Sequence, residues 1–257
     1  MPTVAPEIRI VKDPEELTRA AAGEFVRCAK EAVRQLGRFT VALSGGTTPR
    51  ALYCLLATQP TFRTLLPWRS AHFFWGDERH VPPDHEDSNY RVAREAMLSL
   101  VEIPPENIHR IHAENPDAAA VAAEYESELL RFFAPKASKL PRFDLVLLGM
   151  GPDGHTASLF PGSDALHVQD RLVTATWVEK FHGHRITLTL PVLNNAATVL
   201  FLAAGKEKAE VVREVLSRVE QPVKAETRFP ASLVRPTNGR LLWIVDELAA
   251  QLLALGR

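Results

Sequence analysis

The sequence predicts a single α/β domain spanning residues 1–257, built on a mostly parallel open sheet with helices on both faces. Short apolar segments typical of buried strands alternate along the chain with amphipathic segments long enough to be helices. Parallel strands need crossover connections of this length, and the helices then cover both faces of the sheet. No repeat, low-complexity tract or long linker interrupts the alternation, so we expect one domain.

Six segments combine helical spacing of apolar residues with start and stop signals. The first has Asp13 as a cap and Pro14 at its first position, and Gly37 ends it. In the second, we expect Thr48 to be the cap and Pro49 the first helical residue. In chain order, the helix candidates are residues 13–37, 47–57, 87–101, 117–134, 206–219 and 246–255.

Eight short apolar segments are strand candidates, and the clearest is "FDLVLLGMG" at residues 143–151. Its continuous apolar run is typical of a strand buried on both faces. The candidate at 38–46 runs into two glycines, and the one at 71–79 ends in charged residues. In chain order, the strand candidates are residues 7–11, 38–46, 71–79, 143–151, 171–178, 185–190, 197–204 and 240–245.

Composition and charge exclude several classes of partner. The formal net charge is −1, so no global positive field attracts nucleic acid or an anionic membrane. No apolar run approaches the ~20 residues that span a bilayer, and the N-terminal stretch lacks the apolar core of a signal peptide. The two cysteines fit neither a disulfide framework nor a zinc site. We therefore expect a cytoplasmic monomer or weak homo-oligomer that binds a small molecule.

The candidate binding site follows from the ends of the predicted strands, because ligands of open α/β sheets bind outside the carboxyl ends of the strands. The segment "ALSGGTTPR" combines glycines that permit close approach to a ligand with hydroxyl groups and a helix start. Ser44, Gly45, Gly46 and Thr47 therefore form a candidate phosphate cradle. The same residues would also suit an ordinary strand-to-helix turn.

The segment "GDERHVPPDHEDSNY" places Asp77 and Arg79 at the end of a predicted strand. An arginine there could bind an anion in bidentate fashion or stabilise a developing negative charge. The acidic and histidine residues at 84–87 match no zinc or EF-hand spacing, so we expect no metal site. We interpret them as a solvated loop, with Asp87 or Ser88 capping the next helix.

His155 lies in "GMGPDGHTASLFPG", directly after the clearest buried strand and at the expected start of a helix. A simple chain reversal has no use for an imidazole, and histidine titrates near neutrality, which suits a general base. Asp153 could orient the imidazole or simply hold the turn.

Three basic side chains are further candidates for binding a phosphate. Lys206 follows a predicted strand, with Lys208 as the alternative, and Arg185 stands where another strand begins. Each could equally be an exposed surface charge. The sequence has no nucleophile elbow, so a serine hydrolase triad is unsupported. It has no Walker loop or dinucleotide fingerprint either, and we expect no cofactor. An anion cradle, basic ligands and one histidine base suit attack of water on an activated carbonyl of a phosphorylated small molecule.

These motifs together resemble the 6-phosphogluconolactonase family. The resemblance runs through "VALSGGTTPRALY", "FFWGDERHVPPDHEDSNYRVAREAML", "FDLVLLGMGPDGHTASLFPG", "RITLTLPVLNNA" and "FPASLVRPTNGRLLWIVDELAA", which together cover nearly the whole chain. It implies the α/β fold also used by glucosamine-6-phosphate deaminases and ribose-5-phosphate isomerases. In two departures, Thr47 stands where serine is common, and "KFHGHR" lacks the proline-rich sequence usual before Arg185.

The resemblance implies hydrolysis of 6-phospho-D-glucono-1,5-lactone to 6-phospho-D-gluconate, the second step of the oxidative pentose phosphate pathway, with no metal or cofactor. His155 would deprotonate the attacking water and then protonate the ring oxygen, while Arg79 stabilises negative charge on the intermediate. Asp77 and Asp153 would be catalytic or structural. The 6-phosphate would be held by Ser44, Gly45, Gly46, Thr47, Arg185 and Lys206.

Two other functions stay open. Glucosamine-6-phosphate deaminases have a similar GxGxDGH loop, but the loop continues "AFNEP", whose glutamate takes part in the chemistry, where this chain has "ASLFP". They also have "DEY" in place of "DER". A non-catalytic sugar-phosphate sensor of this fold would need a DNA-binding helix-turn-helix, and we expect none because too little chain precedes the first predicted strand.

Overall fold

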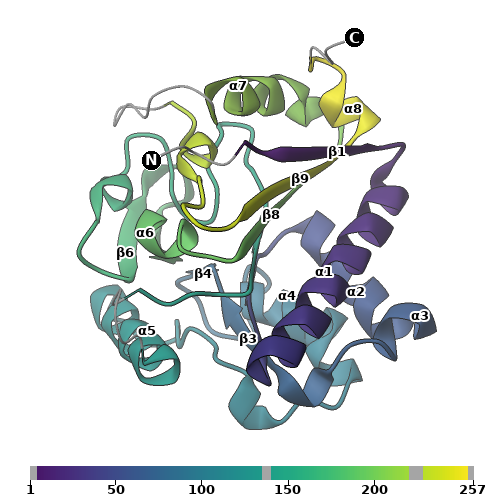
Figure 1. Cartoon of the computed structure of the whole chain (residues 1–257). Coiled ribbons are helices and arrows are strands. Elements are labelled where there is room, and N and C mark those ends of the chain that lie inside the picture. The colour runs from purple at the N-terminus through teal and green to yellow at the C-terminus, as the bar shows by residue number, and fades with distance from the viewer. Residues whose placement is uncertain (1–4, 135–139, 220–227, 254–257) are drawn as a thin grey trace.

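Two β-sheets with helices around them form the α/β fold, as the computed structural model shows for residues 5–134, 140–219 and 228–253 (Figure 1). The larger sheet has six parallel strands in the order β1-β9-β8-β5-β2-β3, which confirms the predicted fold class. Its strands are β1 (Glu7–Val11), β2 (Phe39–Leu43), β3 (Ala71–Trp75), β5 (Leu145–Leu148), β8 (Thr198–Ala203) and β9 (Arg240–Asp246).

Helices cover both faces of the parallel sheet. On one side α1 (Pro14–Leu36) packs against β2, β8 and β9 and against α2 (Thr47–Thr58), whereas α7 (Ala209–Val219) and α8 (Glu247–Ala250) lie on the other side (Figure 1). The helix α5 (Ala118–Phe133) covers the smaller sheet. Shorter helices are α3 (Pro60–Arg63), α4 (Asn89–Ala96) and α6 (Leu190–Leu193). Within the described residues, no helix is both long and apolar enough to cross a membrane.

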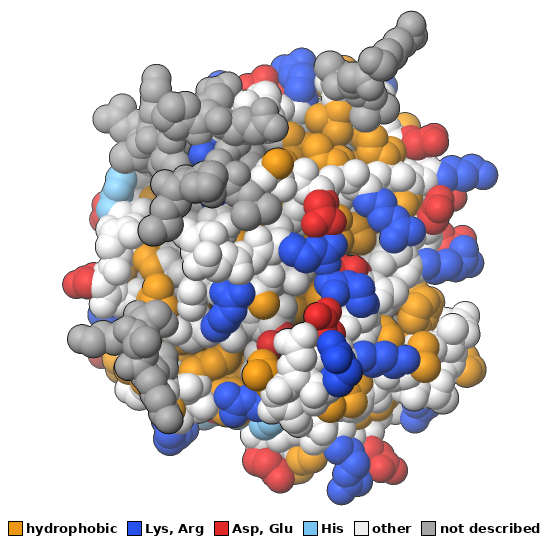
Figure 2. Space-filling view, viewed as in Figure 1, with side chains coloured by type: hydrophobic (Ala, Val, Ile, Leu, Met, Phe, Trp, Pro, Cys, Tyr) orange, Lys and Arg blue, Asp and Glu red, His pale blue; other side chains and the backbone are white. Residues whose placement is uncertain are grey.

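The core explains the long apolar runs of the sequence. Every residue of β2, β5 and β8 is buried, because helices cover both faces of these central strands. Trp243 of β9 stacks on Phe201 of β8 with ring centroids 4.0 Å apart. Figure 2 shows basic and acidic groups interspersed over one face of the molecule. Arg27 of α1, for example, pairs with both Glu24 and Glu31.

The predicted strand at residues 71–79 is in fact two strands in different sheets. It divides at Gly76, which separates β3 from β4 (Asp77–Arg79). The Gly76 N–H donates to Leu43 O of the parallel sheet at 2.8 Å, and its carbonyl accepts from Leu188 N of the smaller sheet at 2.9 Å. The acidic residues of β4 thus leave the apolar sheet and find polar partners elsewhere.

The candidates at 171–178 and 185–190 form β6 (Val173–Val178) and β7 (Gly183–Leu188), which pair antiparallel rather than joining the parallel sheet. The connection between them is too short for a parallel crossover, and antiparallel strands need only such a turn. With β4, they make a three-stranded sheet in the order β4-β7-β6.

Two predicted helix starts are wrong. Gly46, with φ of 104°, is the N-cap of α2, so Thr47 is its first residue and Pro49 lies inside the first turn. No helix begins at His155. The chain turns there because Gly154, Ala157 and Gly162 have positive φ values of 76°, 47° and 72°, which a helix does not allow.

Candidate active site

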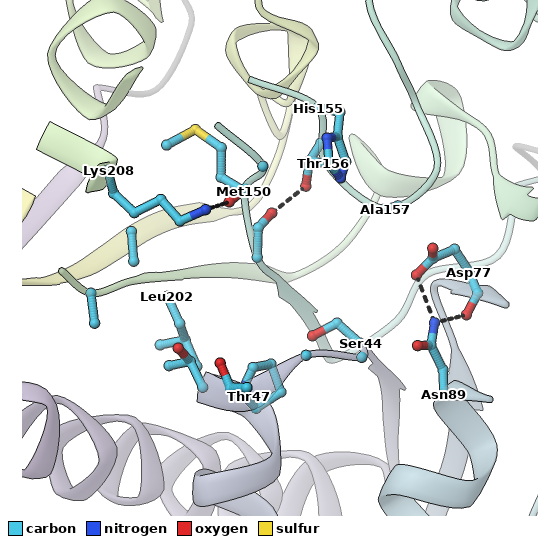
Figure 3. Close-up of a pocket in the computed structure, with 18 of the residues that line it drawn as sticks. Ser44, Thr47, Asp77, Asn89, Met150, His155, Thr156, Ala157, Leu202 and Lys208 are labelled. Carbon is cyan, nitrogen blue, oxygen red and sulfur yellow. Dashed lines mark hydrogen bonds between the residues drawn. The ribbon is translucent and has the colours of Figure 1, made fainter. Parts of the chain in front are cut away.

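A cleft of about 240 Å³ opens at the carboxyl ends of β2, β5 and β8, where open α/β sheets bind ligands (Figure 3). Figure 3 shows His155 on one side of the cleft and Ser44 and Thr47 on the opposite side. The cleft is lined by residues 44–49 between β2 and α2, 149–151 and 155–157 after β5, 202–204 and Lys208 after β8, and Asp77, Arg79 and Asn89.

The loop after β2 is rigid and offers groups to a ligand. The Tyr53 hydroxyl accepts from Ser44 N at 3.0 Å and donates to Ser44 O at 2.7 Å, which fixes the start of the loop. A Cβ on Gly45 would lie 1.8 Å from Asn89 Oδ1, so only glycine fits there. Gly46 needs its positive φ. The Ser44 Oγ is buried without a partner among the described residues and is free to donate to a ligand.

His155 is held by a carboxylate and keeps one nitrogen free. Its Nδ1 lies 2.5 Å from Asp153 Oδ1, and its ring stacks on Phe160 with centroids 4.2 Å apart. Burial opposes ionisation of Asp153, but its hydrogen bonds to His155 and the charge of that ring outweigh burial, so the pKa of Asp153 is lowered. Gly151 is required because a Cβ there would lie 2.1 Å from the imidazole. Among the described residues, none hydrogen-bonds His155 Nε2.

Arg79 and Arg185 lie directly opposite each other on β4 and β7. Arg79 lines the cleft and donates through Nη1 to Asp87 O at 2.9 Å. Arg185 lies beside the cleft rather than in its wall, with its guanidinium 5.1 Å from the Phe181 ring centroid. Burial and then the charge of Arg79 lower the pKa of Arg185. Two like charges at one register position are unfavourable, and an anion beside them relieves this repulsion.

Asp77 lines the cleft, but both of its carboxylate oxygens already have partners. Oδ2 accepts from Ser158 Oγ at 2.6 Å, and Oδ1 accepts from Asn89 Nδ2 at 3.3 Å. Asn89 Nδ2 also donates to Asp77 O at 2.9 Å. Asp77 therefore ties β4 to the His155 loop and to the start of α4. Asn89 and Ser158 were not predicted from the sequence as site residues. The only signal for Asn89 was its place directly after Ser88, which caps α4.

The lysine that lines the cleft is Lys208 rather than Lys206. Gly205, with φ of 96°, starts a 3₁₀ turn at Lys206–Lys208, and its N–H is held by the Asp246 carboxylate. This turn leaves Lys206 exposed and outside the cleft lining, while Lys208 lines the cleft and donates to Met150 O at 2.9 Å. The two lysines are close in sequence, and only the turn geometry separates them.

Within the described ranges 5–134, 140–219 and 228–253, no group of three His, Cys, Asp or Glu side chains is placed to hold a metal ion. In the loop at 84–87, His85 Nδ1 and Asp87 Oδ2 lie 3.8 Å apart, with both side chains substantially exposed. Asp87 and Ser88 were both predicted as candidates for the N-cap of the helix that follows. The N-cap of α4 is Ser88, whose hydroxyl accepts from Arg91 N.

Comparisons with known proteins identify the family and the fold. A family model described as glucosamine-6-phosphate isomerases/6-phosphogluconolactonase matches residues 12–243. A 6-phosphogluconolactonase of Nostoc sp. is 46% identical over 242 residues, covering 94% of this chain and 96% of that protein. The structure of a 6-phosphogluconolactonase from Trypanosoma cruzi superposes with a TM-score of 0.83 at 31% identity, covering 99% of this chain and 100% of that chain. A monomeric glucosamine-6-phosphate deaminase, 21% identical with a TM-score of 0.78, covers 96% and 99% and shares the fold.

Proposed function

Since this chain belongs to the glucosamine-6-phosphate isomerase/6-phosphogluconolactonase family, we propose that it hydrolyses 6-phospho-D-glucono-1,5-lactone to 6-phospho-D-gluconate in the oxidative pentose phosphate pathway. The observation that carries the proposal is the environment of His155. Its Nδ1 is bound by Asp153, its Nε2 has no hydrogen-bond partner in the part of the chain that the structure describes, and the residue lines a cleft whose opposite wall is the candidate anion cradle. A lactone whose phosphate is remote from its reacting carbonyl needs a base on one side of the cleft, at the carbonyl, and an anion site on the other side, at the phosphate.

His155 acts in turn as general base and general acid. With the Nδ1–H of His155 donating to the Asp153 carboxylate, Nε2 has the lone pair that takes a proton from water. The hydroxide adds to C1 of the lactone, and Arg79 stabilises the oxyanion formed from the carbonyl oxygen. The bond from C1 to the ring oxygen then breaks, and the imidazolium returns its proton to that oxygen. Asp153 orients the ring and stabilises its charged form.

The 6-phosphate binds at the cradle. Backbone N–H groups at the start of α2 and the free Ser44 hydroxyl donate to phosphate oxygens. Lys208, rather than Lys206, supplies the ammonium group from the cleft wall. Arg185 adds positive charge beside Arg79. Asp77 has a positioning role, because both of its oxygens are already engaged.

The test is hydrolysis of freshly generated 6-phosphogluconolactone with and without the protein. The lactone opens spontaneously, so only the rate above background counts. We expect a large excess rate, and a much smaller one with unphosphorylated gluconolactone, which lacks the group that the cradle binds. Absence of any excess from folded protein would refute the proposal. Ammonia release from glucosamine 6-phosphate, measured in parallel, would instead favour the deaminase.

A further inference from the structure

Glu78 is a buried carboxylate that lies next to the candidate site but does not line it. Glu78 lies between Asp77 and Arg79 on β4 and is 2% exposed. Neighbouring residues of a strand point to opposite faces, so Glu78 lies on the side of β4 away from Arg79, against the start of α4. The proposed mechanism gives it no role, yet burying an acidic side chain is costly unless its hydrogen bonds are satisfied.

Four donors converge on the Glu78 carboxylate. Oε1 accepts from the backbone N–H groups of Arg79 at 2.8 Å and Asn89 at 2.7 Å. Oε2 accepts from Tyr90 N at 2.8 Å and Ser88 Oγ at 3.1 Å. Burial raises the pKa of Glu78 to about 7, against the three backbone donors that lower it. Three of the four partners are backbone N–H groups, which can only donate, and an ionised carboxylate satisfies all four partners.

These bonds hold two residues of the cleft at once. Arg79 is the proposed stabiliser of the oxyanion. Asn89 contacts the cradle, since its Oδ1 fills the space beside Gly45, and its Nδ2 holds Asp77. One oxygen of Glu78 therefore fixes the backbone of Arg79 relative to that of Asn89. The cradle and the cationic wall come from distant parts of the chain, and this carboxylate sets the spacing between them.

We propose that Glu78 is a positioning residue that fixes Arg79 and Asn89 in the geometry the reaction needs. This inference rests on the proposed lactonase function. A displacement of about 1 Å in such a site can cost on the order of 10²-fold in rate. Loss of the Glu78 carboxylate should therefore lower kcat through Arg79 and raise KM through the cradle.

The experiment compares Glu78→Gln with a matched control, Ser88→Ala. The NH2 group of the glutamine must face either the N–H of Tyr90 or those of Arg79 and Asn89. Even with the NH2 group toward Tyr90, the repulsion between two donors displaces the start of α4, which carries Asn89. Ser88→Ala removes the cap of α4 and one weaker bond to Glu78, but leaves the bonds to Arg79 and Asn89 intact. We expect kcat/KM of folded Glu78→Gln to fall by about 10²-fold. For Ser88→Ala we expect a lower Tm with kcat and KM near those of the wild type.

Kinetic constants are measured below the Tm of both variants and expressed per folded molecule. Wild-type kcat and KM in Glu78→Gln, with only a lower Tm, would overturn the proposal. If Glu78→Gln does not fold, Glu78→Asp takes its place: it keeps the charge but is one methylene too short to reach all four donors. A loss of kcat/KM in folded Glu78→Asp supports the positioning role, and wild-type kinetics reject it.

Calorimetric binding of inorganic phosphate separates this inference from the proposed function. A wild type that binds phosphate but lacks lactonase activity would refute the function alone. Glu78 would then be judged by phosphate affinity, which the positioning role predicts to be weaker in Glu78→Gln than in Ser88→Ala. Equal phosphate affinity in the two variants would overturn the role of Glu78.

Discussion

Among the described residues, three histidines have Nδ1 within 2.7 Å of a carboxylate oxygen, namely His109, His112 and His155, and only His155 lines the cleft. Of the other two, His109 is buried and is the closer counterpart of His155. His155 Nδ1 lies 2.5 Å from Asp153, and His109 Nδ1 lies 2.7 Å from Glu128. Both carboxyl groups have a lowered pKa. Burial is the largest single influence on Asp153 and raises its pKa, but the hydrogen bonds to His155 and the charge of that ring together outweigh burial, whereas in Glu128 the hydrogen bond to His109 is the largest influence. Both rings also stack on a phenylalanine with centroids 4.2 Å apart.

The difference lies in the second nitrogen. His109 Nε2 lies 3.2 Å from His72 Nδ1, and only 9% of the His109 side chain is exposed. No described partner bonds His155 Nε2, and 22% of that side chain is exposed at the cleft. The carboxylate–histidine pair alone is therefore no sign of catalysis. A base needs a nitrogen that a water molecule can reach.

The largest effect is expected from His155→Ala. A proton-transfer group contributes about 10²–10⁴-fold, so turnover of the phosphorylated lactone should fall by at least about 10²-fold, while 6-phosphogluconate still binds. Steady-state kinetics and calorimetry check the two parts. Near-normal turnover would remove His155 from the mechanism and erase the distinction between the two histidines.

Asp153→Asn is expected to have the next largest effect on activity. The amide neither stabilises the imidazolium nor reliably holds the Nδ1 proton, so kcat should fall by about 10–10²-fold, below the full contribution of the base. Thermal unfolding should change little, because Asp153 is only partly buried. An unchanged kcat would show that Asp153 only holds the turn.

Glu128→Gln makes the corresponding substitution in the His109–Glu128 pair. Glutamine keeps one acceptor for His109 but removes the negative charge from this partly buried hydrogen bond, which should reduce the free energy of unfolding by about 1 kcal/mol. Urea unfolding measures this loss, and kcat/KM should stay within about twofold of the wild type, because no proton of the reaction passes through His109. A large loss of activity with wild-type stability would contradict the comparison.

Substitution of His72 should have a smaller effect, on thermal stability and only at acidic pH. Burial, then the charges of His109 and Arg38, lower the pKa of His72 to about 4. The folded state therefore binds fewer protons than the unfolded chain between pH 6.5 and 4, so stability from this group is lost as pH falls through that range. The Tm of His72→Phe should fall less steeply than that of the wild type between these pH values. Parallel Tm curves would exclude His72 as a source of acid sensitivity.

Apolar patterning predicts the strands and long helices of this fold well, because burial on both faces leaves a signature in each segment. It does not predict which sheet receives a strand. β4 separates from β3 at Gly76, which hydrogen-bonds to both sheets. Its partners are distant in sequence, because Leu43 lies more than 30 residues before Gly76 and Leu188 more than 100 residues after it.

The site residues were predictable where chemistry is concentrated in a glycine-rich loop, as for Ser44 and His155. They were missed where a residue acts through long-range contacts. Asn89 resembles an ordinary first residue of a helix, and its importance depends on its contact with Gly45. Likewise Lys208 differs from Lys206 only through the turn that Gly205 begins.

Gly76 has one further consequence, which concerns motion. A single residue donates to one sheet and accepts from the other, so the two sheets cannot swing apart as independent bodies without breaking one of these hydrogen bonds. Since the cleft takes residues from both sheets, its shape is set before a ligand arrives. Hydrogen exchange at the Leu188 amide reports directly on any opening between the sheets, and a ligand that bridges both walls should slow that exchange.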